Sequence, residues 1–493
     1  VARQVIITDP RGEIALVRQL FPPLNRADLL KDRPLQIDQS DIYLYELPEE
    51  ILVEEAVCVI NRLNELHQFA ATADPNFHIS PAGWIGAGSP WTQNGAPWVQ
   101  TNGGGYGAPS QARFENQWAF GPEGINLHGK PEYIDAGQKE KNKIRIGVFD
   151  TSPFSDTVQM GETCANCPLS VLMYEDVAEV LTSTIKLTVH HPEISDTPDC
   201  PGWDRSKVVY NPSPRHRLDD PGFDPNISME DQNINNHGLF VAALAHRVAP
   251  DAEIHLIRVL NDDGCGDLYG ILDAINQFVS TADKADGTII NLSLGLHMPS
   301  NPERLALSAE AHSLSWTLRY ARRNHAIVVA AAGNDSYLVP VGSDPESMEL
   351  PAWFGEVIGV ASSTRDRRRA CFSNEGDVTA PGGDGYPGAE GDCWVPDCRE
   401  SGQENGCIVS MVRWPSPGYA YWTGTSFSTP LVSGLAALKL EQRLGPGEKA
   451  NAAIVGQVKD RLSRSSCSPS ADAAYLGAGI VDVPRTWDDI DCP

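Results

Sequence analysis

A serine with the surroundings of a nucleophile stands near the end of this 493-residue chain. The segment Gly424–Pro430 reads Gly-Thr-Ser-Phe-Ser-Thr-Pro and runs into a stretch of small and apolar residues. Pro430 is compatible with the first turn of a helix, so Ser426 is expected at the positive N-terminal end of that helix, where a developing oxyanion is stabilised. Ser426 is therefore a candidate nucleophile, although a serine at a helix start is more often only a cap.

Three other polar residues are expected where a strand ends or a helix begins. Asp150 follows the apolar run Ile144–Phe149, and a carboxylate there can orient a histidine and stabilise its cation. His237 opens a helix of small and apolar residues, and Asn334 closes an apolar run with an amide that can donate to an oxyanion. Each of these residues, taken singly, also has an ordinary structural explanation as a turn former, a helix cap or a hydrogen-bonded histidine.

The order of these residues along the chain is more informative than any one of them. Aspartate, histidine, oxyanion asparagine and serine follow one another here in the order found in subtilisins. On this evidence residues 115–440 resemble the subtilase family of serine peptidases, also called peptidase S8. Five further segments are similar to that family: Gln117–Phe120, Ile125–Asn126, Asn291–Gly295, Phe372–Gly376 and Thr379–Gly382.

The resemblance implies a serine endopeptidase that forms an acyl-enzyme on Ser426. His237 would take the hydroxyl proton while Asp150 fixes the imidazole tautomer, and Asn334 with the Ser426 backbone N–H would stabilise the oxyanion. Because His237 must be neutral to accept a proton, activity is expected to fade in mild acid. The chemistry requires no cofactor. Structural calcium is an expectation from the family, with no ligands assigned.

The same resemblance implies where a peptide substrate binds. The segment Asp262–Tyr269 is expected to align an extended peptide as an added strand, and Ser293–Gly295 would form the opposite wall. Gly333 would keep the primary pocket open to a side chain. The residues expected to contact the substrate are Gly264, Gly266, Ser293, Leu294, Gly295 and Gly333.

The sequence departs from the family pattern at two positions near the predicted active site, and it carries a long insertion there. Leu239 and Ala243 stand where the family commonly has Thr and Gly, and both preserve a helix of apolar and small residues. The stretch between Asp150 and His237 is much longer than in compact members. Residues 153–233 are therefore predicted to be an insertion that flanks the active-site rim and narrows the choice of substrate.

The elements that must position these residues alternate between strand-like apolar runs and helical stretches, which is typical of a mostly parallel sheet flanked by helices. The predicted strands are Ile144–Phe149, Ala252–Val259, Gly287–Leu292, Ala326–Ala331 and Val357–Val360. The predicted helices are His237–Val248, Leu268–Ala282, Ala306–Asn324 and Ser428–Leu444. The predicted class is therefore α/β, in the three-layer subtilisin-like arrangement, with the catalytic groups gathered where strands end.

Residues 1–81 are predicted to form a separate small α+β module. The apolar runs Val5–Ile7, Ile14–Leu20 and Ile42–Leu47 precede a helical stretch from Pro48 to about Ala71, whose apolar face must pack on the strands. The residues of that face are Leu52, Ala56, Val59, Ile60, Leu63, Leu66 and Ala70.

Residues 82–113, rich in Gly, Pro, Asn, Gln and Trp, are predicted to be a linker, and residues 114–493 to be the peptidase domain. The module and linker resemble, in position, the prodomain arrangement of secreted subtilases. This implies a folding chaperone and intramolecular inhibitor that is released by self-cleavage in the linker. A permanent accessory domain is the alternative.

The charge balance narrows the possible partners. Asp and Glu outnumber Lys and Arg by 65 to 38, which gives a formal net charge of −27. Such a chain repels nucleic acid and anionic lipid, whereas its acidity fits solubility, a preference for basic substrates, or calcium binding. No apolar run approaches the roughly 20 residues that a membrane span requires. Protein or peptide substrates are the expected partners.

Eleven cysteines, most of them in polar stretches, favour disulfides in loops and an oxidising compartment. Cys58 and Cys371 are predicted to be buried free thiols. Cys164 and Cys167 have the spacing of half a zinc site, but no second pair follows, so a disulfide or free thiols are the preferred interpretation. We expect a secreted or extracellular protein, or a cytoplasmic one if the first residue given is the true start.

Three other classes of protein fit these residues less well. A sedolisin-type acid peptidase would use Glu as its base, which the His237 motif argues against. An α/β-hydrolase needs Gly-x-Ser-x-Gly, whereas residue 428 is Ser. A catalytically inactive subtilase homologue that acts as a binding protein is the alternative function, and no triad position supports it.

Overall fold

The computed structural model describes fourteen segments of the chain. They are residues 3–67, 70–81, 111–129, 142–153, 187–190, 234–261, 264–281, 285–296, 311–338, 343–387, 393–394, 406–412, 418–468 and 475–492. Most of the predicted linker and of the predicted insertion, together with Cys164, Cys167 and Asp262, lie outside the described residues. The proposed domain boundaries therefore stay predictions.

Seven parallel strands form the central sheet, in the order β15-β14-β13-β11-β7-β9-β8. Their bounds are β7 Ile144–Asp150, β8 Leu187–His190, β9 Glu253–Arg258, β11 Gly287–Leu292, β13 Ala326–Ala331, β14 Val357–Ser363 and β15 Val378–Pro381. All five predicted strands are present. Every residue of β7, β11, β13, β14 and β15 is buried, which explains why these strands read as continuous apolar runs.

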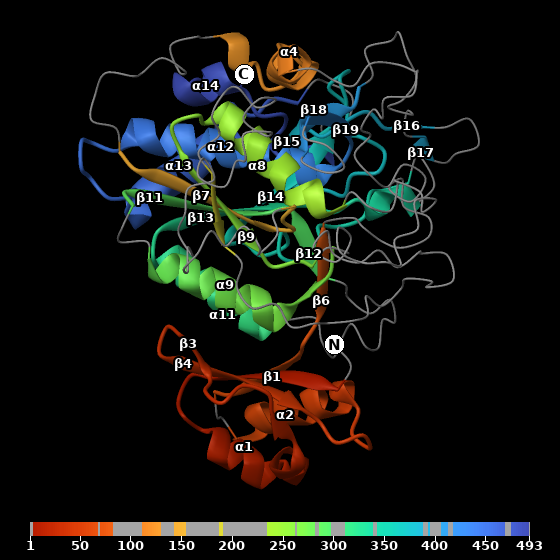
Figure 1. Cartoon of the computed structure of the whole chain (residues 1–493), viewed down its shortest axis with the longest axis vertical. Helices are drawn as coiled ribbons and strands as arrows, with labels where there is room; N and C mark the ends of the chain where they lie inside the picture. Colours follow the sequence, from red (N-terminus) through yellow and green to blue (C-terminus); the bar gives the residue numbers. More distant parts are fainter. Residues whose placement is uncertain are drawn as a thin grey trace, which may run out of the picture.

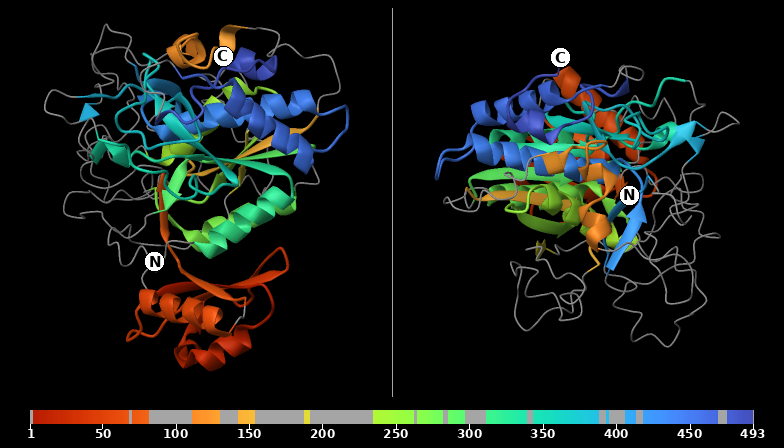
Figure 2. Two further views of the ribbon diagram at one scale, coloured as in Figure 1. Left: turned by 180° about the vertical axis from the view of Figure 1, so that it is seen from behind. Right: turned by 90° about the horizontal axis from the view of Figure 1, so that it is seen from above.

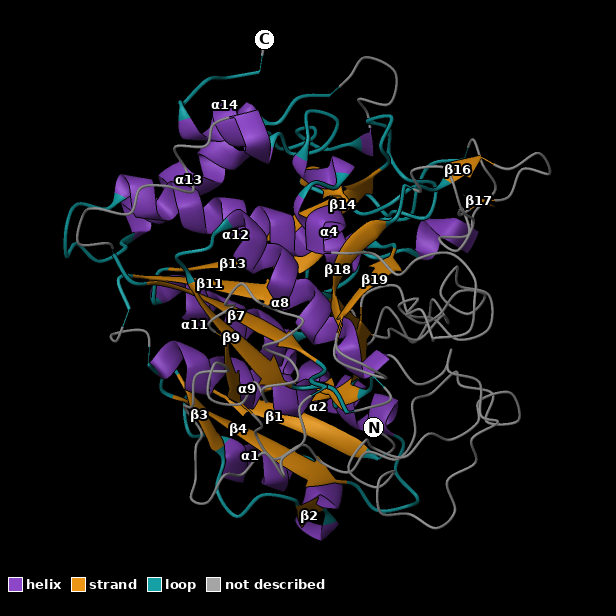
Figure 3. Cartoon of the chain, turned by 45° about the horizontal axis from the view of Figure 1, so that its top comes forward, coloured by secondary structure: helices purple, strands orange, loops and turns teal. Residues whose placement is uncertain are grey.

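Helices cover both faces of this sheet, which confirms the predicted α/β class (Figures 1 and 3). One layer contains α8 (His237–Val248), α12 (Thr425–Arg443) and α13 (Ala452–Ser465), and the other contains α9 (Leu268–Ser280) and α11 (His312–Arg323). We call the part of the molecule that is built around this sheet the peptidase part, after the predicted domain. Its shorter helices are α4 (Gln111–Glu115), η2 (Trp118–Phe120), η3 (Leu127–Gly129), η7 (Ile234–Asn236), η9 (Asp335–Leu338) and α14 (Val483–Trp487). No helix in the described part of the chain is long and apolar enough to cross a bilayer.

The N-terminal residues form an antiparallel sheet of their own, with helices on one face and the peptidase part on the other (Figures 1 and 2). Its elements are β1 (Gln4–Asp9), α1 (Ile14–Leu20), η1 (Pro22–Arg26), β2 (Asp28–Leu29), β3 (Leu35–Ile37), β4 (Ser40–Glu46), α2 (Val53–His67) and β5 (Thr72–Pro75). Val5 and Ile7 belong to the core that holds α2, whereas Ile6 between them packs with residues of α9 and α11. Successive side chains of β1 point to opposite faces of the sheet, so one face packs against α2 and the other packs against the peptidase part.

Two predictions for this module need correction. The apolar run Ile14–Leu20 is helix α1, because the Asp9 carboxylate accepts the backbone N–H groups of Glu13 (2.8 Å) and Ile14 (2.7 Å) and caps it. In α2, Ala56 and Ile60 are buried as predicted, but Leu52 and Leu66 are 62% and 63% exposed. The helix is shorter than predicted, so the outer positions of its apolar face do not reach the sheet.

Short strands around the central sheet complete the peptidase part. They are β6 (His78–Pro81), β10 (Gly266–Asp267), β12 (Leu294–Leu296), β16 (Tyr386–Pro387), β17 (Cys393–Trp394), β18 (Ile408–Val412) and β19 (Gly418–Trp422). A disulfide joins Cys371 to Cys393 beside the β16–β17 pair, so the prediction that Cys371 is a free thiol was wrong. Cys371 pairs with a cysteine 22 residues away, a contact that local polarity does not reveal. Cys58 is free, but partly exposed rather than buried.

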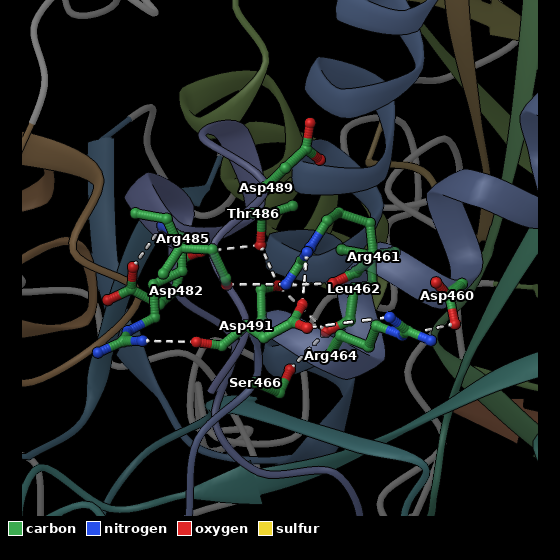
Figure 4. A network of polar contacts seen from close by, with 12 residues as sticks. Asp460, Arg461, Leu462, Arg464, Ser466, Asp482, Arg485, Thr486, Asp489 and Asp491 are labelled. Atoms are coloured by element: carbon green, nitrogen blue, oxygen red, sulfur yellow. Dashed lines mark hydrogen bonds and ion pairs between the residues drawn. The ribbon is translucent and has the colours of Figure 1, made fainter. Parts of the chain in front are cut away.

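A polar network ties the C-terminal segment to the α12–α13 layer. The side chain of Lys439 on α12 is fully buried, and its ammonium donates to the carboxylate of Asp489 (2.7 Å), which Arg443 also contacts. Arg461 on α13 pairs with Asp491 at 2.7 Å (Figure 4). The Cys467–Cys492 disulfide closes the same region. The chain as far as Cys492 is therefore packed as part of the peptidase fold.

We expect His246, near the C-terminal end of α8, to make stability depend on pH. Burial, and then the neighbouring Arg247, lowers the pKa of His246 to about 4. An unfolded chain binds this proton near pH 6.5, so between about pH 6.5 and 4 the unfolded state holds more protons and folding weakens as the pH falls. The loss is expected to be on the order of 2–3 kcal/mol.

Thermal unfolding of Ser426→Ala, a background that avoids self-digestion, tests this at pH 7.5 and pH 4.5 with and without His246→Gln. The glutamine variant should lose less stability between the two pH values than its parent. An equal loss in both proteins would contradict the assignment.

Candidate active site

Asp150 and His237 form a buried hydrogen-bonded pair. Asp150 ends strand β7 with no exposure to solvent, and its two carboxylate oxygens lie 2.8 and 2.9 Å from His237 Nδ1 at the start of α8. The backbone N–H of Thr151 donates to the same carboxylate at 2.7 Å. A carboxylate at Nδ1 holds a proton there and leaves Nε2 as the basic nitrogen, as a general base requires.

The residue after the histidine must be glycine. A Cβ on Gly238 would lie 2.1 Å from the backbone oxygen of Thr151 and 2.9 Å from Asp150 Cβ. The start of α8 can therefore approach the end of β7 only without a side chain at this position. This close approach is what brings the imidazole against the carboxylate.

Aromatic side chains hold the imidazole from the side. The rings of Trp422 and Phe427 each lie 5.3 Å from the His237 ring, and Phe240 packs against both. Because Phe427 directly follows Ser426, this packing also fixes the start of α12 next to the histidine. Leu239 and Ala243, the two departures from the family pattern, are buried in the core and leave this arrangement intact.

Ser426 lies in the first turn of α12. The helix begins at Thr425, earlier than predicted, so Pro430 lies in its second turn and not in its first. Proline has no N–H for the carbonyl of Ser426, four residues earlier. That carbonyl instead accepts the hydroxyl of Ser293 at 2.8 Å, while the Ser426 hydroxyl donates to the Ser293 carbonyl at 3.3 Å. The proline thus frees a carbonyl that ties the serine to the neighbouring segment.

A second group of residues supports this tie. Asn291, next to the last residue of strand β11, donates to the Ser293 hydroxyl at 3.0 Å and accepts the Ser433 hydroxyl at 2.8 Å. Asn291 lies in the segment that the sequence marked as substrate-flanking, but its link to α12 was not predicted. No spacing rule joins residues 291 and 433.

Asn334 follows strand β13 and is oriented toward the same serine. Its side-chain oxygen accepts the backbone N–H of Thr425 at 3.1 Å, so its NH₂ group points away from Thr425. The preceding Gly333 has φ +104°, and a Cβ there would lie 2.5 Å from Asn374 Nδ2. A glycine is required at this turn both by its backbone angle and by its neighbours.

The predicted peptide-binding edge is occupied by the chain itself. Strand β6 pairs antiparallel with β10 on one side and with β12 on the other. Ile79 lies opposite Gly266 and Leu296, Ser80 opposite Gly295, and Pro81 opposite Leu294. Ile79 is fully buried in an apolar cluster with residues of α9.

The predicted site residues thus gather in one region. Asp150 and His237 touch directly, Asn334 reaches Ser426 through Thr425, and Ser293 bonds Ser426 twice. The remaining predicted positions lie on or beside β10, β12 and β13: Gly264, Gly266, Leu294, Gly295 and Gly333. Sequence reasoning missed Thr151, Asn291, Trp422, Ser433 and Glu349, which all act through contacts between distant segments.

The described residues contain no group of three or more His, Cys, Asp or Glu side chains placed to hold a metal ion.

Comparison with known proteins shows which family the sequence resembles. The model of the subtilase family, Peptidase S8, matches residues 142–475. A thermophilic serine proteinase from Bacillus sp. (strain AK1) is 32% identical over 47% of this chain and 48% of its own length. Subtilisin DY from Bacillus licheniformis is 28% identical over 50% of this chain and 76% of its own length. Thermitase from Thermoactinomyces vulgaris is 27% identical over 47% of this chain and 70% of its own length.

Proposed function

Because the chain belongs to the subtilase family, we propose that it is a serine endopeptidase that cleaves extended polypeptides through an acyl-enzyme on Ser426. The observation that carries the proposal is the buried Asp150–His237 pair, with Nδ1 2.8 Å from the carboxylate, held against the start of α12. An inactive homologue that acts as a binding protein would have no chemical use for a histidine held in one tautomer.

In the proposed mechanism, the Ser426 hydroxyl turns from the Ser293 carbonyl to His237 Nε2. His237 takes the hydroxyl proton as Ser426 Oγ attacks the peptide carbonyl carbon. The Asn334 side-chain amide and the Ser426 backbone N–H donate to the oxyanion, and Asp150 stabilises the imidazolium. The protonated His237 gives its proton to the departing amine, and water repeats the sequence on the acyl-enzyme. No step requires a cofactor.

Labelling with a fluorophosphonate probe tests the proposed function. The unchanged protein should be labelled and Ser426→Ala should not. Ser428→Ala is a matched control, because Ser428 lies on the same helix turn with its hydroxyl bonded to the Ala380 carbonyl. Equal labelling of the unchanged protein and Ser426→Ala would overturn the proposal.

We further propose that residues 1–81 inhibit the enzyme intramolecularly and are released by cleavage within residues 82–113. Strand β6 supports this proposal, since it lies where a substrate strand would be added. The module also satisfies helix ends of the peptidase part. Asp74 accepts the N–H groups of His312 (2.9 Å) and Ser313 (2.6 Å) at the start of α11, and Asn76 accepts that of Tyr269 (2.9 Å) on α9.

Replacing Asp74 by alanine should therefore weaken docking of the module. The N–H groups at the start of α11 lose a buried carboxylate partner, at a cost of about 1–3 kcal/mol. The Asp74→Ala protein is expected to react with the fluorophosphonate probe roughly ten-fold faster than the unchanged full-length chain.

Asp28→Ala, an exposed charge removal in the same module, should leave the labelling rate unchanged. Purified enzyme that is fully active with residues 1–81 still attached would contradict the inhibitory role. A permanent accessory domain would then be the better explanation.

Structural calcium and an oxidising compartment complete the proposal. The disulfides Cys371–Cys393 and Cys467–Cys492 support a location where thiols are oxidised, outside the cytoplasm. Calcium is proposed from the family and the acidic composition alone. Removal of calcium by a chelator is expected to lower the thermal unfolding temperature, and an unchanged temperature would contradict a structural calcium site.

A further inference from the structure

Glu349 lies between the two glycines that flank the expected primary pocket. A Cβ on Gly295 would be 2.1 Å from Glu349 Oε2, and a Cβ on Gly333 would be 2.8 Å from Glu349 Cγ and Cδ. We call the space between Gly295 and Gly333 the S1 region. A side chain at either glycine would collide with the carboxyl-bearing side chain of Glu349, which borders this space.

The backbone holds Glu349 in this position. Its N–H donates to the Ala332 carbonyl at 2.9 Å, next to Gly333, and the Leu350 carbonyl accepts the N–H of Leu296 at 3.0 Å, next to Gly295. Hydrogen bonds to both walls therefore place the side chain between them. Glu349 is nevertheless partly exposed, so a ligand group that enters the S1 region can reach it.

The register of β6 shows which substrate residue meets this carboxyl. Pro81, the last residue of β6, lies opposite Leu294. In a peptide bound as β6 is bound, the next residue lies opposite Ser293, whose carbonyl is 3.3 Å from Ser426 Oγ. A residue at that position lies next to the nucleophile, so it is expected to precede the scissile bond and to direct its side chain to the S1 region.

A second carboxyl accompanies Glu349. Burial, and then the charge and hydrogen bond of Asp335, raises the pKa of Glu349 well above its usual range. One oxygen of Asp335 is buried without a hydrogen-bond partner. Within the described residues, neither carboxyl forms an ion pair with a lysine or arginine. The two adjacent carboxyls have no lysine or arginine partner among the described residues, and an entering ammonium or guanidinium would supply one.

We propose that Glu349, assisted by Asp335, makes the enzyme selective for peptide bonds that follow lysine or arginine. This inference rests on the proposed endopeptidase function. A cationic side chain completes a desolvated ion pair, whereas an apolar side chain leaves the two carboxyls in an unfavourable environment. A glutamate or aspartate side chain would add a further acidic group beside these two carboxyls and is disfavoured by repulsion. The net charge of −27 also draws basic polypeptides to the enzyme.

Cleavage of peptides that differ only in the residue before the scissile bond tests the proposal. With the enzyme as purified, kcat/KM for Arg and Lys is expected to exceed that for Leu, Phe and Glu by about 10²-fold or more. Glu349→Gln should lower kcat/KM for Arg and Lys by about 10²-fold and leave the value for Leu within a few-fold. Asp335→Asn should act in the same direction by a smaller factor.

Glu346→Gln is the matched control, because Glu346 is an exposed carboxylate on the same segment and should not alter selectivity. If Glu349→Gln does not fold, the selectivity of the unchanged enzyme and of Asp335→Asn still decides the matter. An enzyme that labels at Ser426 but prefers Leu or Phe would overturn this inference and leave the proposed function standing. If the enzyme is neither labelled by the fluorophosphonate probe nor able to cleave peptides, both the proposed function and this inference are overturned.

Discussion

Ser426→Ala is expected to lower kcat by about 10⁶-fold while the protein stays folded. The hydroxyl of Ser426 has one hydrogen bond, to the Ser293 carbonyl, and the tie between these segments is kept by the Ser293 hydroxyl on the Ser426 carbonyl. The alanine variant therefore keeps its architecture and loses only the nucleophile. The residual rate comes from the oxyanion donors and from substrate positioning.

Two measurements check this result. Steady-state hydrolysis of a peptide substrate gives the loss in kcat, and the thermal unfolding midpoint shows that the fold is kept. Intact-mass analysis gives a third reading, since the variant should retain residues 1–81 if release depends on its own Ser426. A variant with more than a hundredth of the original activity would exclude Ser426 as the nucleophile.

Asp150→Asn is expected to lower kcat by about 10⁴-fold. The carboxylate accepts from His237 Nδ1 and from the Thr151 N–H, and it has no exposure to solvent. An asparagine that keeps its oxygen on the Thr151 N–H turns its NH₂ toward Nδ1. The imidazole must then carry its proton on Nε2, where it cannot accept one from Ser426.

The control for Asp150→Asn is the same substitution at an aspartate far from the proposed active site. Asp460→Asn removes an exposed carboxylate on α13 that pairs with Arg464, and it should leave kcat unchanged. Both variants should keep the unfolding midpoint within a few degrees of the parent. If Asp150→Asn retains a tenth or more of the original kcat, the Asp150–His237 pair is structural and not catalytic.

Much of the peptidase architecture could be predicted because its strands and helices have recognisable local patterns of apolar residues. The buried strands β11 and β13 and helix α8 have the predicted bounds, since a parallel sheet covered on both faces requires continuous apolar runs. The match of residues 142–475 to the subtilase family confirms the predicted family. The module at the N-terminus was less well predicted, because Asp9 caps a helix at a run that could equally form a strand.

What the sequence by itself determined was the set of candidate catalytic groups: an aspartate at a strand end, a histidine and a serine at helix starts, and an asparagine after a strand, in one order. What only the tertiary structure decided was how these groups are held and what surrounds them. The Ser293–Ser426 tie, the Cys371–Cys393 disulfide and strand β6 between β10 and β12 all join residues far apart in the chain. Glu349 has no local signature, because it becomes significant only where folding places it between Gly295 and Gly333. Local patterns record which face of an element is buried, whereas specificity depends on which distant side chain reaches the same space.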